Sequence, residues 1–286
     1  MLVTIIIYGI ILTALYSLMA MGFWLIFSVA DVINLTHGMT IISACYVVFM
    51  LVSALHWPLW LGIPSGVLAA VILVLLIYGA FIRRMLLAPH TSMILLTAGM
   101  AMVIQQAIIL LAGPQTKFVP EMVAGSLSVV GVVVSWQQVL SVAVVLVITV
   151  AMGIFLHNSK MGRAIRAVSQ ESETAALSGI NPEAVFVVTV IIAGILAGTA
   201  GVLVAPLETL VPELGWETMV TAFTVTVLAG LGGPIWGVVV AAAIVSYSEL
   251  LTSFHISPEL KEASAFMIMI LTLMFKPSGL FGKRRL

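Results

Sequence analysis

Long apolar runs follow one another through almost the whole chain of 286 residues, and they constrain its fold more than any other feature. A helix needs about 20 mostly apolar residues to cross a bilayer, and several runs reach that length. Charged residues make up only 8% of the chain, which excludes a water-soluble globule. The runs fall at 3–28, 39–55, 59–82, 91–112, 136–157, 184–206, 219–250 and 263–275.

Helices are expected to span the membrane, because the runs lack the alternating pattern of outer-membrane barrels. The sequence therefore predicts an all-α fold, a polytopic membrane helical bundle that forms a single transmembrane domain over 1–286. The single cysteine, Cys45, excludes an internal disulfide. The histidines are scattered without ligand spacing, so we expect no metal site, and no cofactor is predicted.

Lys and Arg residues predict the orientation, because they gather in cytoplasmic loops. Placing the loops after 59–82 and 136–157 inside, together with the C-terminus, leaves nine of the eleven basic residues in the cytoplasm. The N-terminus then lies outside and the C-terminus inside. On this scheme an acidic set occupies the outer face: Glu121, Glu208, Glu213, Glu217, Glu259 and Glu262.

Two of the apolar stretches are expected to be discontinuous helices. Residues 219–250 contain LAGLGGPIWG at 228–237, where glycines precede Pro234, a residue that interrupts helical hydrogen bonding. We interpret this stretch as a kinked hairpin that enters and leaves from the outer side. A similar break lies between Asp31 and Gly38. Because the two patterns are offset by about 195–200 residues, they resemble the internal repeats of transporters.

Polar groups and glycines at these breaks are candidate linings of a translocation path, because freed backbone groups must face protein or water. Glu249, near the outer end of its helix, could instead reach the surface. The candidate path residues are Asn34, Thr36, His37, Gly38, Gly230, Gly232 and Gly233.

The only long polar stretch is GRAIRAVSQESETAALSGIN at 162–181, within a loop at 158–183. Its apolar and charged residues alternate with helical spacing, and Gly179 stands where a glycine ends a helix. This predicts a short amphipathic helix at the cytoplasmic surface. It is either a connector resting on anionic lipid headgroups or a docking helix for a cytoplasmic partner.

Taken together, this loop, INLTHG at 33–38, LAGLGGPIWG at 228–237 and KPSGLFG at 276–282 resemble the permease subunit of branched-chain amino-acid ABC importers. The resemblance implies a second homologous permease, two cytoplasmic ATPase subunits and an extracytoplasmic solute-binding protein. It also implies a bacterial or archaeal cytoplasmic membrane. The ATPase-coupling residues that it implies are Gly162, Arg163, Arg166, Ala167, Ala175 and Gly179.

No phosphate-binding G-x-x-x-x-G-K-[ST] loop is present, so ATP hydrolysis is expected on separate subunits and the chain is not predicted to be an enzyme. No nucleic-acid partner is expected. An ABC permease for urea, short amides or another small polar solute is an alternative. An ion-coupled secondary transporter is a further one, although such coupling usually needs ionisable groups inside the membrane.

Overall fold

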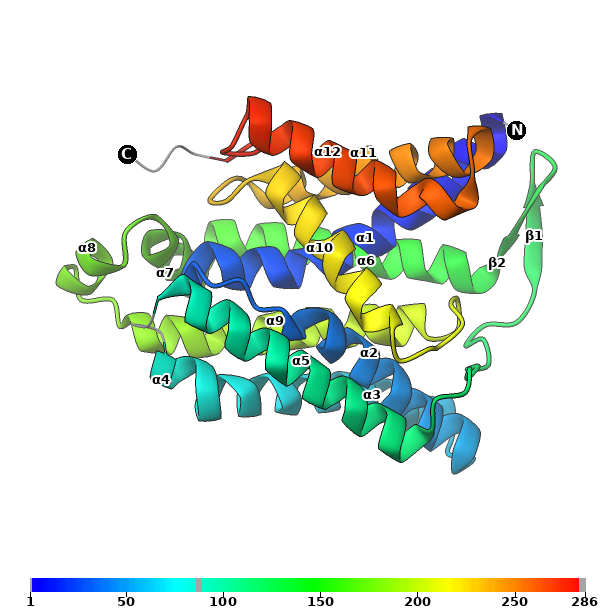
Figure 1. The fold of residues 1–286 in the computed structure, drawn as a ribbon, viewed down its shortest axis with the longest axis horizontal. Coiled ribbons are helices and arrows are strands. Elements are labelled where there is room, and N and C mark those ends of the chain that lie inside the picture. Colours follow the sequence, from blue (N-terminus) through cyan, green and yellow to red (C-terminus); the bar gives the residue numbers. More distant parts are fainter. Residues whose placement is uncertain (1, 86–88, 283–286) are drawn as a thin grey trace. The chain divides into compact units, whose positions relative to one another are not determined.

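The computed structural model describes residues 2–85 and 89–282, most of them in helices (Figure 1). The longer helices are α1 (Leu2–Ala30), α2 (Thr36–Val48), α3 (Leu59–Ile77), α5 (His90–Ala112), α6 (Trp136–Asn158), α9 (Pro182–Val204), α10 (Leu214–Ala229), α11 (Ile235–His255) and α12 (Lys261–Phe275). The shorter elements are η1 (Phe49–Ala54), η2 (Tyr78–Ile82), α4 (Arg83–Met85), β1 (Ser126–Val129), β2 (Val132–Ser135), α7 (Lys160–Gln170), α8 (Ser172–Leu177) and η3 (Pro258–Leu260). Lys283, Arg284 and Arg285, which entered the orientation prediction, lie outside the described residues.

Seven helical segments in the described part of the chain are long and apolar enough to cross a membrane. Two further apolar helices are shorter, α10 with 16 residues and α12 with 15. Each predicted apolar run corresponds to one helical segment, except that 219–250 is divided between α10 and α11. The prediction of a polytopic helical membrane protein is therefore confirmed.

Both predicted breaks are present, and they have the same length and begin in the same way. Each comprises five residues, 31–35 and 230–234, so the offset is 199 residues (230 minus 31). Each begins with a residue of positive φ, 53° at Asp31 and 87° at Gly230. Both residues donate their N–H to the carbonyl four positions back, a common way for a helix to end.

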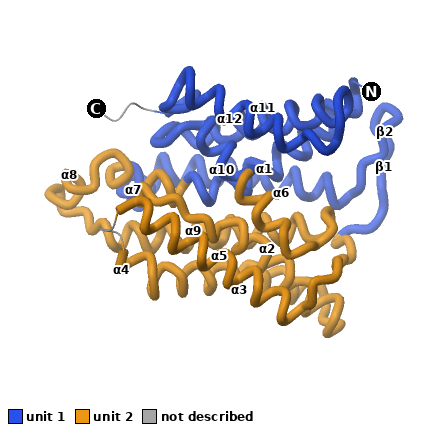
Figure 2. Tube along the Cα trace, viewed as in Figure 1, with its two compact units in different colours: residues 1–24, 123–166, 221–286 blue, residues 25–122, 167–220 orange. Residues whose placement is uncertain are grey.

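The chain forms two compact units (Figure 2). Unit 1 contains residues 1–24, 123–166 and 221–286, and unit 2 contains residues 25–122 and 167–220. The two units are described separately below.

In unit 2, α9 packs closely against α2 and α3 through glycines. A Cβ atom at Gly198 would lie 2.7 Å from the Cα of Val67, and Gly194 is in a similarly close position against α3. Cys45 of α2 donates its thiol hydrogen to the carbonyl of Gly201 in α9, with an Sγ–O distance of 3.1 Å. These glycines, which are four residues apart in α9, thus permit the close approach of the helices.

In unit 1, half-buried polar side chains of α1 contact buried polar side chains of α11. The Tyr16 hydroxyl donates to the Glu249 carboxylate across 2.6 Å, and the hydroxyls of Thr13 and Ser246 lie 2.7 Å apart. Glu249 is only 4% exposed. The interpretation that Glu249 reaches the surface is therefore wrong, because α1 covers the carboxylate and supplies a hydrogen-bond donor inside the protein.

Candidate functional site

The polar segment 158–183 forms two short helices rather than the predicted single one. They are separated at Glu171, whose φ of −156° and ψ of 103° are extended. α7 buries Ile165 and Val168 on its apolar face, as its amphipathic pattern predicts. The helix does not continue because the six residues after Val168 are all polar, so another turn would have no apolar side chain to pack against the protein.

The first predicted coupling residues attach α7 to the end of α6. Gly162 lies so close that a Cβ atom there would be 2.7 Å from the Cα of Leu156. Arg163 donates to the carbonyl of Asn158 across 3.0 Å, and Arg166 contacts His157 at 3.5 Å. The last carbonyls of a helix lack partners within it and carry partial negative charge, so both guanidinium groups stabilise the α6 terminus.

The remaining predicted coupling residues lie on the second half of α7 and at α8. Ala167, the last member on α7, is half-buried, whereas Ala175 is buried. Gly179 has a φ of 83° and follows the end of α8, which confirms the prediction that a glycine ends the helix here. The adjacent Leu177 is 91% exposed, which makes it an apolar side chain on an otherwise polar segment. Sequence reasoning did not select Leu177, although an isolated leucine in a polar loop is a recognisable signal.

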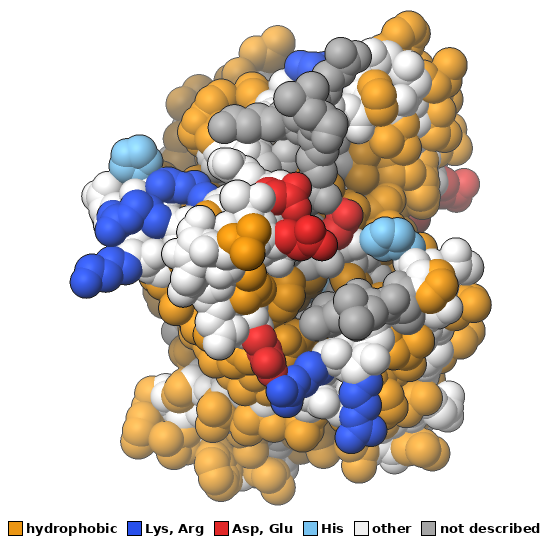
Figure 3. Space-filling view, turned by 90° about the vertical axis from the view of Figure 1, so that its left-hand side faces the viewer, with side chains coloured by type: hydrophobic (Ala, Val, Ile, Leu, Met, Phe, Trp, Pro, Cys, Tyr) orange, Lys and Arg blue, Asp and Glu red, His pale blue; other side chains and the backbone are white. Residues whose placement is uncertain are grey.

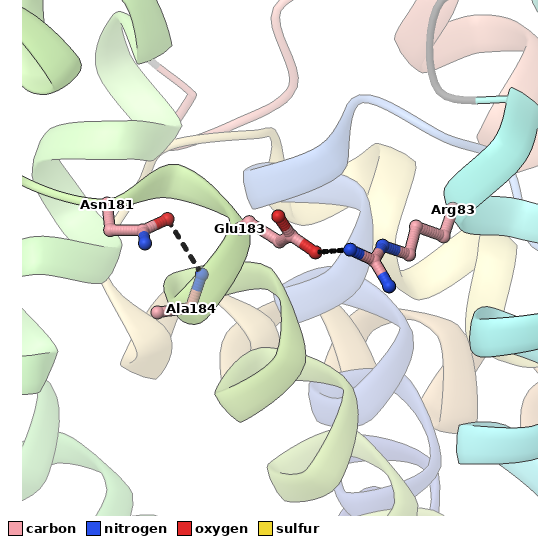
Figure 4. A network of polar contacts seen from close by, with 4 residues as sticks. All are labelled: Arg83, Asn181, Glu183 and Ala184. Atoms are coloured by element: carbon pink, nitrogen blue, oxygen red, sulfur yellow. Dashed lines mark hydrogen bonds and ion pairs between the residues drawn. The ribbon is translucent and has the colours of Figure 1, made fainter.

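The far end of the segment belongs to unit 2, where a helix cap and an ion pair hold it (Figure 4). Asn181 caps α9 by accepting a hydrogen bond from the backbone N–H of Ala184 across 3.2 Å. Glu183, in the first turn of α9, forms an ion pair with Arg83 of α4. In Figure 3, Lys, Arg, Asp and Glu side chains gather on the face where α7 and α8 lie.

At the first break, the polar side chains organise the start of α2. The Asn34 carboxamide oxygen accepts from the backbone N–H of Thr36 at 3.1 Å and from its hydroxyl at 2.6 Å. Asn34, Thr36 and His37 are each at most 2% exposed. A Cβ atom at Gly38 would lie 2.9 Å from the backbone nitrogen of Met219. The lack of a side chain at Gly38 therefore allows the start of α10 to pack closely against α2.

A cavity of about 20 Å³ lies beside the first break in unit 2. Asn34, Tyr78 and Thr189 contribute polar side chains to its lining, and the rest of the lining is apolar. Such a volume has room for one water molecule, so an amino acid does not fit there in this conformation.

At the second break, the chain packs against its own C-terminal segment in unit 1. We call residues 276–282 the C-terminal clamp. Leu280 donates its N–H to the carbonyl of Leu228 at 2.8 Å, and Phe281 donates to that of Ala229 at 3.0 Å. These carbonyls belong to the last turn of α10 and have no partner within that helix, so the clamp satisfies them.

The glycines of the second break make room for this clamp. Gly230 lies directly against the backbone of Ser278 and Gly282, and a Cβ atom at Gly233 would be 2.7 Å from the carbonyl oxygen of Phe281. Gly232 differs, because no atom lies within 4 Å of the position its Cβ would take. The motifs at 228–237 and 276–282 thus form one packed structure.

Comparison with known proteins decides the family. The sequence model of one protein family, described as the permease component of the branched-chain amino acid transport system, matches residues 5–273. The chain belongs to this permease family. It is 30% identical to the high-affinity branched-chain amino acid transport system permease protein LivH of Salmonella typhimurium, over 96% of this chain and 94% of that protein. It is 27% identical to BraD of Pseudomonas aeruginosa over the same shares of the two chains.

A more distant relative is the probable branched-chain amino acid transport permease protein LivH of Methanocaldococcus jannaschii, with 26% identity over 96% of this chain and 90% of that protein. No solved structure matches this chain significantly. The permease assignment agrees with the membrane-spanning helices, and the match includes segment 158–183 and both breaks.

Proposed function

We propose that this permease is the membrane-spanning subunit of an ABC importer for branched-chain or related aliphatic amino acids in a bacterial or archaeal cytoplasmic membrane. The observation that carries the proposal is the similarity of nearly the whole chain to permeases named for that transport. Two separate cytoplasmic ATPase subunits drive transport, a second homologous permease completes the membrane part, and an extracytoplasmic solute-binding protein delivers the solute.

The substrate test is uptake of radiolabelled leucine by proteoliposomes that contain the assembled complex. We expect ATP-dependent uptake that unlabelled valine and isoleucine reduce and that unlabelled urea leaves unchanged. If urea competes and the aliphatic amino acids do not, the substrate class is wrong.

We propose that segment 158–183 docks on an ATPase subunit, with Leu177 as an apolar contact in addition to the coupling residues. Leu177 is a sharper test than Arg163 or Arg166, because both arginines also hold the end of α6. Leu177→Ser removes exposed apolar surface and should leave the unfolding temperature unchanged while it weakens ATPase pull-down. Glu173→Gln, another exposed change on α8, is the matched control. Unchanged association of Leu177→Ser would contradict the docking role of this residue.

The proposed orientation has the N-terminus outside and the C-terminus in the cytoplasm. A cysteine at Gln170, which is exposed on α7, tests it by labelling with a membrane-impermeant maleimide. Cys45 is fully buried and can remain in place. We expect labelling of Gln170→Cys only after the membrane is permeabilised, and labelling from the outside would refute the orientation.

The exposed acidic residues Glu208, Glu213 and Glu217 of unit 2 are proposed to guide docking of the solute-binding protein. Exposed ion pairs contribute about 0–1 kcal/mol each, so single changes should be mild. The triple Gln variant should reduce binding-protein-stimulated uptake, and added salt should do the same. Uptake that is insensitive to both changes would leave this face without a docking role.

We further propose that the residues of the two breaks line the translocation path. Of the candidate path residues, His37 is the ionisable one, and it is buried at the start of α2. His37→Ala should lower uptake per assembled complex more than Gln105→Ala does, because Gln105 accepts a hydrogen bond from Trp216 and thus serves packing. Equal uptake by the two variants would contradict the proposal that His37 lines the translocation path.

A further inference from the structure

The β1–β2 hairpin of unit 1 is an uncharged, apolar element at the end of a membrane-spanning helix. No Asp, Glu, Lys or Arg occurs between Glu121 and Lys160, and valines dominate the hairpin. β2 ends at Ser135, and α6, which is long and apolar enough to span a membrane, begins at Trp136. The hairpin therefore adjoins the boundary between membrane and water.

Hydrogen bonds from α1 and from the first residue of α6 hold the hairpin. The Tyr8 hydroxyl of α1 donates to the carbonyl of Val133 at 3.2 Å. The backbone N–H of Trp136 donates to the carbonyl of Gly125 at 3.0 Å. Ser135 and Gln138 form a reciprocal capping box at the start of α6. The direction of the hairpin is therefore set by its contacts with α1 and α6.

This direction places the strands along the membrane boundary. Figure 1 shows β1 and β2 running crosswise to α6. Because α6 crosses the membrane, strands that run across its end follow the surface. Trp136 is 46% exposed, and exposed tryptophans are enriched at the level of the lipid headgroups.

The tip carries an apolar side chain in a strained backbone conformation. Val129 pairs with Val132, so Val130 and Gly131 form a two-residue turn with φ angles of 51° and 82°. Such turns favour Asn-Gly or Asp-Gly, and a β-branched residue at positive φ is unfavourable. Val130 is nevertheless 80% exposed, and Val133 is 62% exposed. In water, the backbone strain at Val130 and the exposure of its apolar side chain would both be unfavourable. In lipid, the exposed side chain would instead be removed from water, which is favourable.

We propose that this hairpin lies in the headgroup and upper acyl region of the bilayer and anchors the connection between α5 and α6 to the lipid surface, with Val130 as its inserted side chain. The uncharged sequence, the adjacent exposed tryptophan and the crosswise strands favour lipid over a soluble protein partner. This inference depends on α6 spanning the membrane and is independent of the transported solute.

The test uses an environment-sensitive fluorophore on Val130→Cys, with the complete protein in lipid nanodiscs that contain brominated phospholipid. The buried native Cys45 gives the labelling background, measured on the unchanged protein. Glu121→Cys, an exposed and normally charged position before the hairpin, is the control. We expect emission at shorter wavelength and strong quenching by brominated lipid at position 130, and a water-like spectrum quenched by iodide at position 121.

Two results would overturn the proposal. A water-like spectrum at position 130 that iodide quenches would place the tip in solvent. Shielding from both brominated lipid and iodide would mean that protein covers it.

A second variant tests whether the Val130 side chain itself, rather than a fluorophore attached at position 130, anchors the hairpin. Val130→Asn relieves backbone strain, because Asn tolerates positive φ, so the unfolding temperature in detergent should not fall. A probe on Val133→Cys should lose most of its lipid quenching when Val130→Asn is added. Unchanged quenching would show that Val130 does not anchor the hairpin.

Discussion

Gly279→Ala should separate the C-terminal clamp from the second break. Gly279 has a φ of 75°, and an L-residue in that conformation costs about 1–2 kcal/mol. Its Cβ would also overlap backbone atoms of Gly230 and lie 2.7 Å from the Val227 carbonyl oxygen. Backbone cannot yield as a side chain does. The clamp must therefore move, which breaks the two hydrogen bonds from Leu280 and Phe281, at about 0.5–1.5 kcal/mol each. The expected loss of stability is about 2–5 kcal/mol.

Gly232→Ala is the matched control, because it changes the same residue type, also at positive φ, within the second break itself. Its φ of 68° imposes a similar backbone cost, but nothing lies within 4 Å of the added atom. Gly232→Ala should lose only about 1–2 kcal/mol. The remaining difference between the variants, about 1–3 kcal/mol, is roughly a factor of 5 to 150 in the ratio of folded to unfolded protein.

The assay is denaturant unfolding of both variants in one detergent, followed by tryptophan fluorescence. Two tryptophans report on this structure: Trp24 donates to the carbonyl of Gly230 at 3.0 Å, and the ring of Trp236 lies 4.6 Å from that of Phe281. Gly279→Ala should also lose uptake per assembled complex. If Gly279→Ala is no less stable than Gly232→Ala, the clamp does not hold the break. If Gly232→Ala alone abolishes uptake, Gly232 acts in transport rather than in packing.

Three further predictions concern buried groups. Tyr16→Phe leaves the Glu249 carboxyl without its donor and should cost about 1–3 kcal/mol of unfolding free energy, whereas Glu249→Gln, which keeps an acceptor, should cost less; equal losses would contradict this pairing. Gly198→Ala should destabilise unit 2 by about 1–3 kcal/mol through overpacking, but Gly99→Ala, with nothing within 4 Å, should be neutral in the same thermal unfolding assay. Cys45 should react with maleimide only at the rate of unfolding, and rapid labelling of the native protein would show that α2 and α9 separate readily.

Helix positions and breaks were predictable because their causes are local. Apolar length sets each crossing, and glycine, proline or a polar cluster interrupts it. The end of α10 at Ala229 and the start of α11 at Ile235 bracket the predicted interruption at 230–234. The amphipathic pattern of α7 likewise predicted which side of that helix is buried.

Features that depend on distant residues were not predictable from spacing. Gly233 and Gly237 have the spacing of a helix-packing pair, yet both lie against Phe281 of the clamp. The burial of Glu249 depends on Tyr16, which is 233 residues away along the chain. The β1–β2 hairpin had a local signal that was missed, a Val-Gly turn between two runs of valine.

The two breaks solve the same backbone problem in different ways, and their residues reflect this. The first break contains Asn34, whose side chain accepts hydrogen bonds from the backbone N–H and the hydroxyl of Thr36 at the start of α2. The second contains glycines, which supply no side-chain donor or acceptor but allow the backbone of 276–282 to approach and satisfy the end of α10. The geometry of the first break therefore depends on its own Asn34 and on Thr97 of α5, whose hydroxyl donates to the carbonyl of Ile33 at 3.3 Å. That of the second depends on a segment more than forty residues further along the chain, so changes near the C-terminus should act on the second break and leave the hydrogen bonds of the first intact.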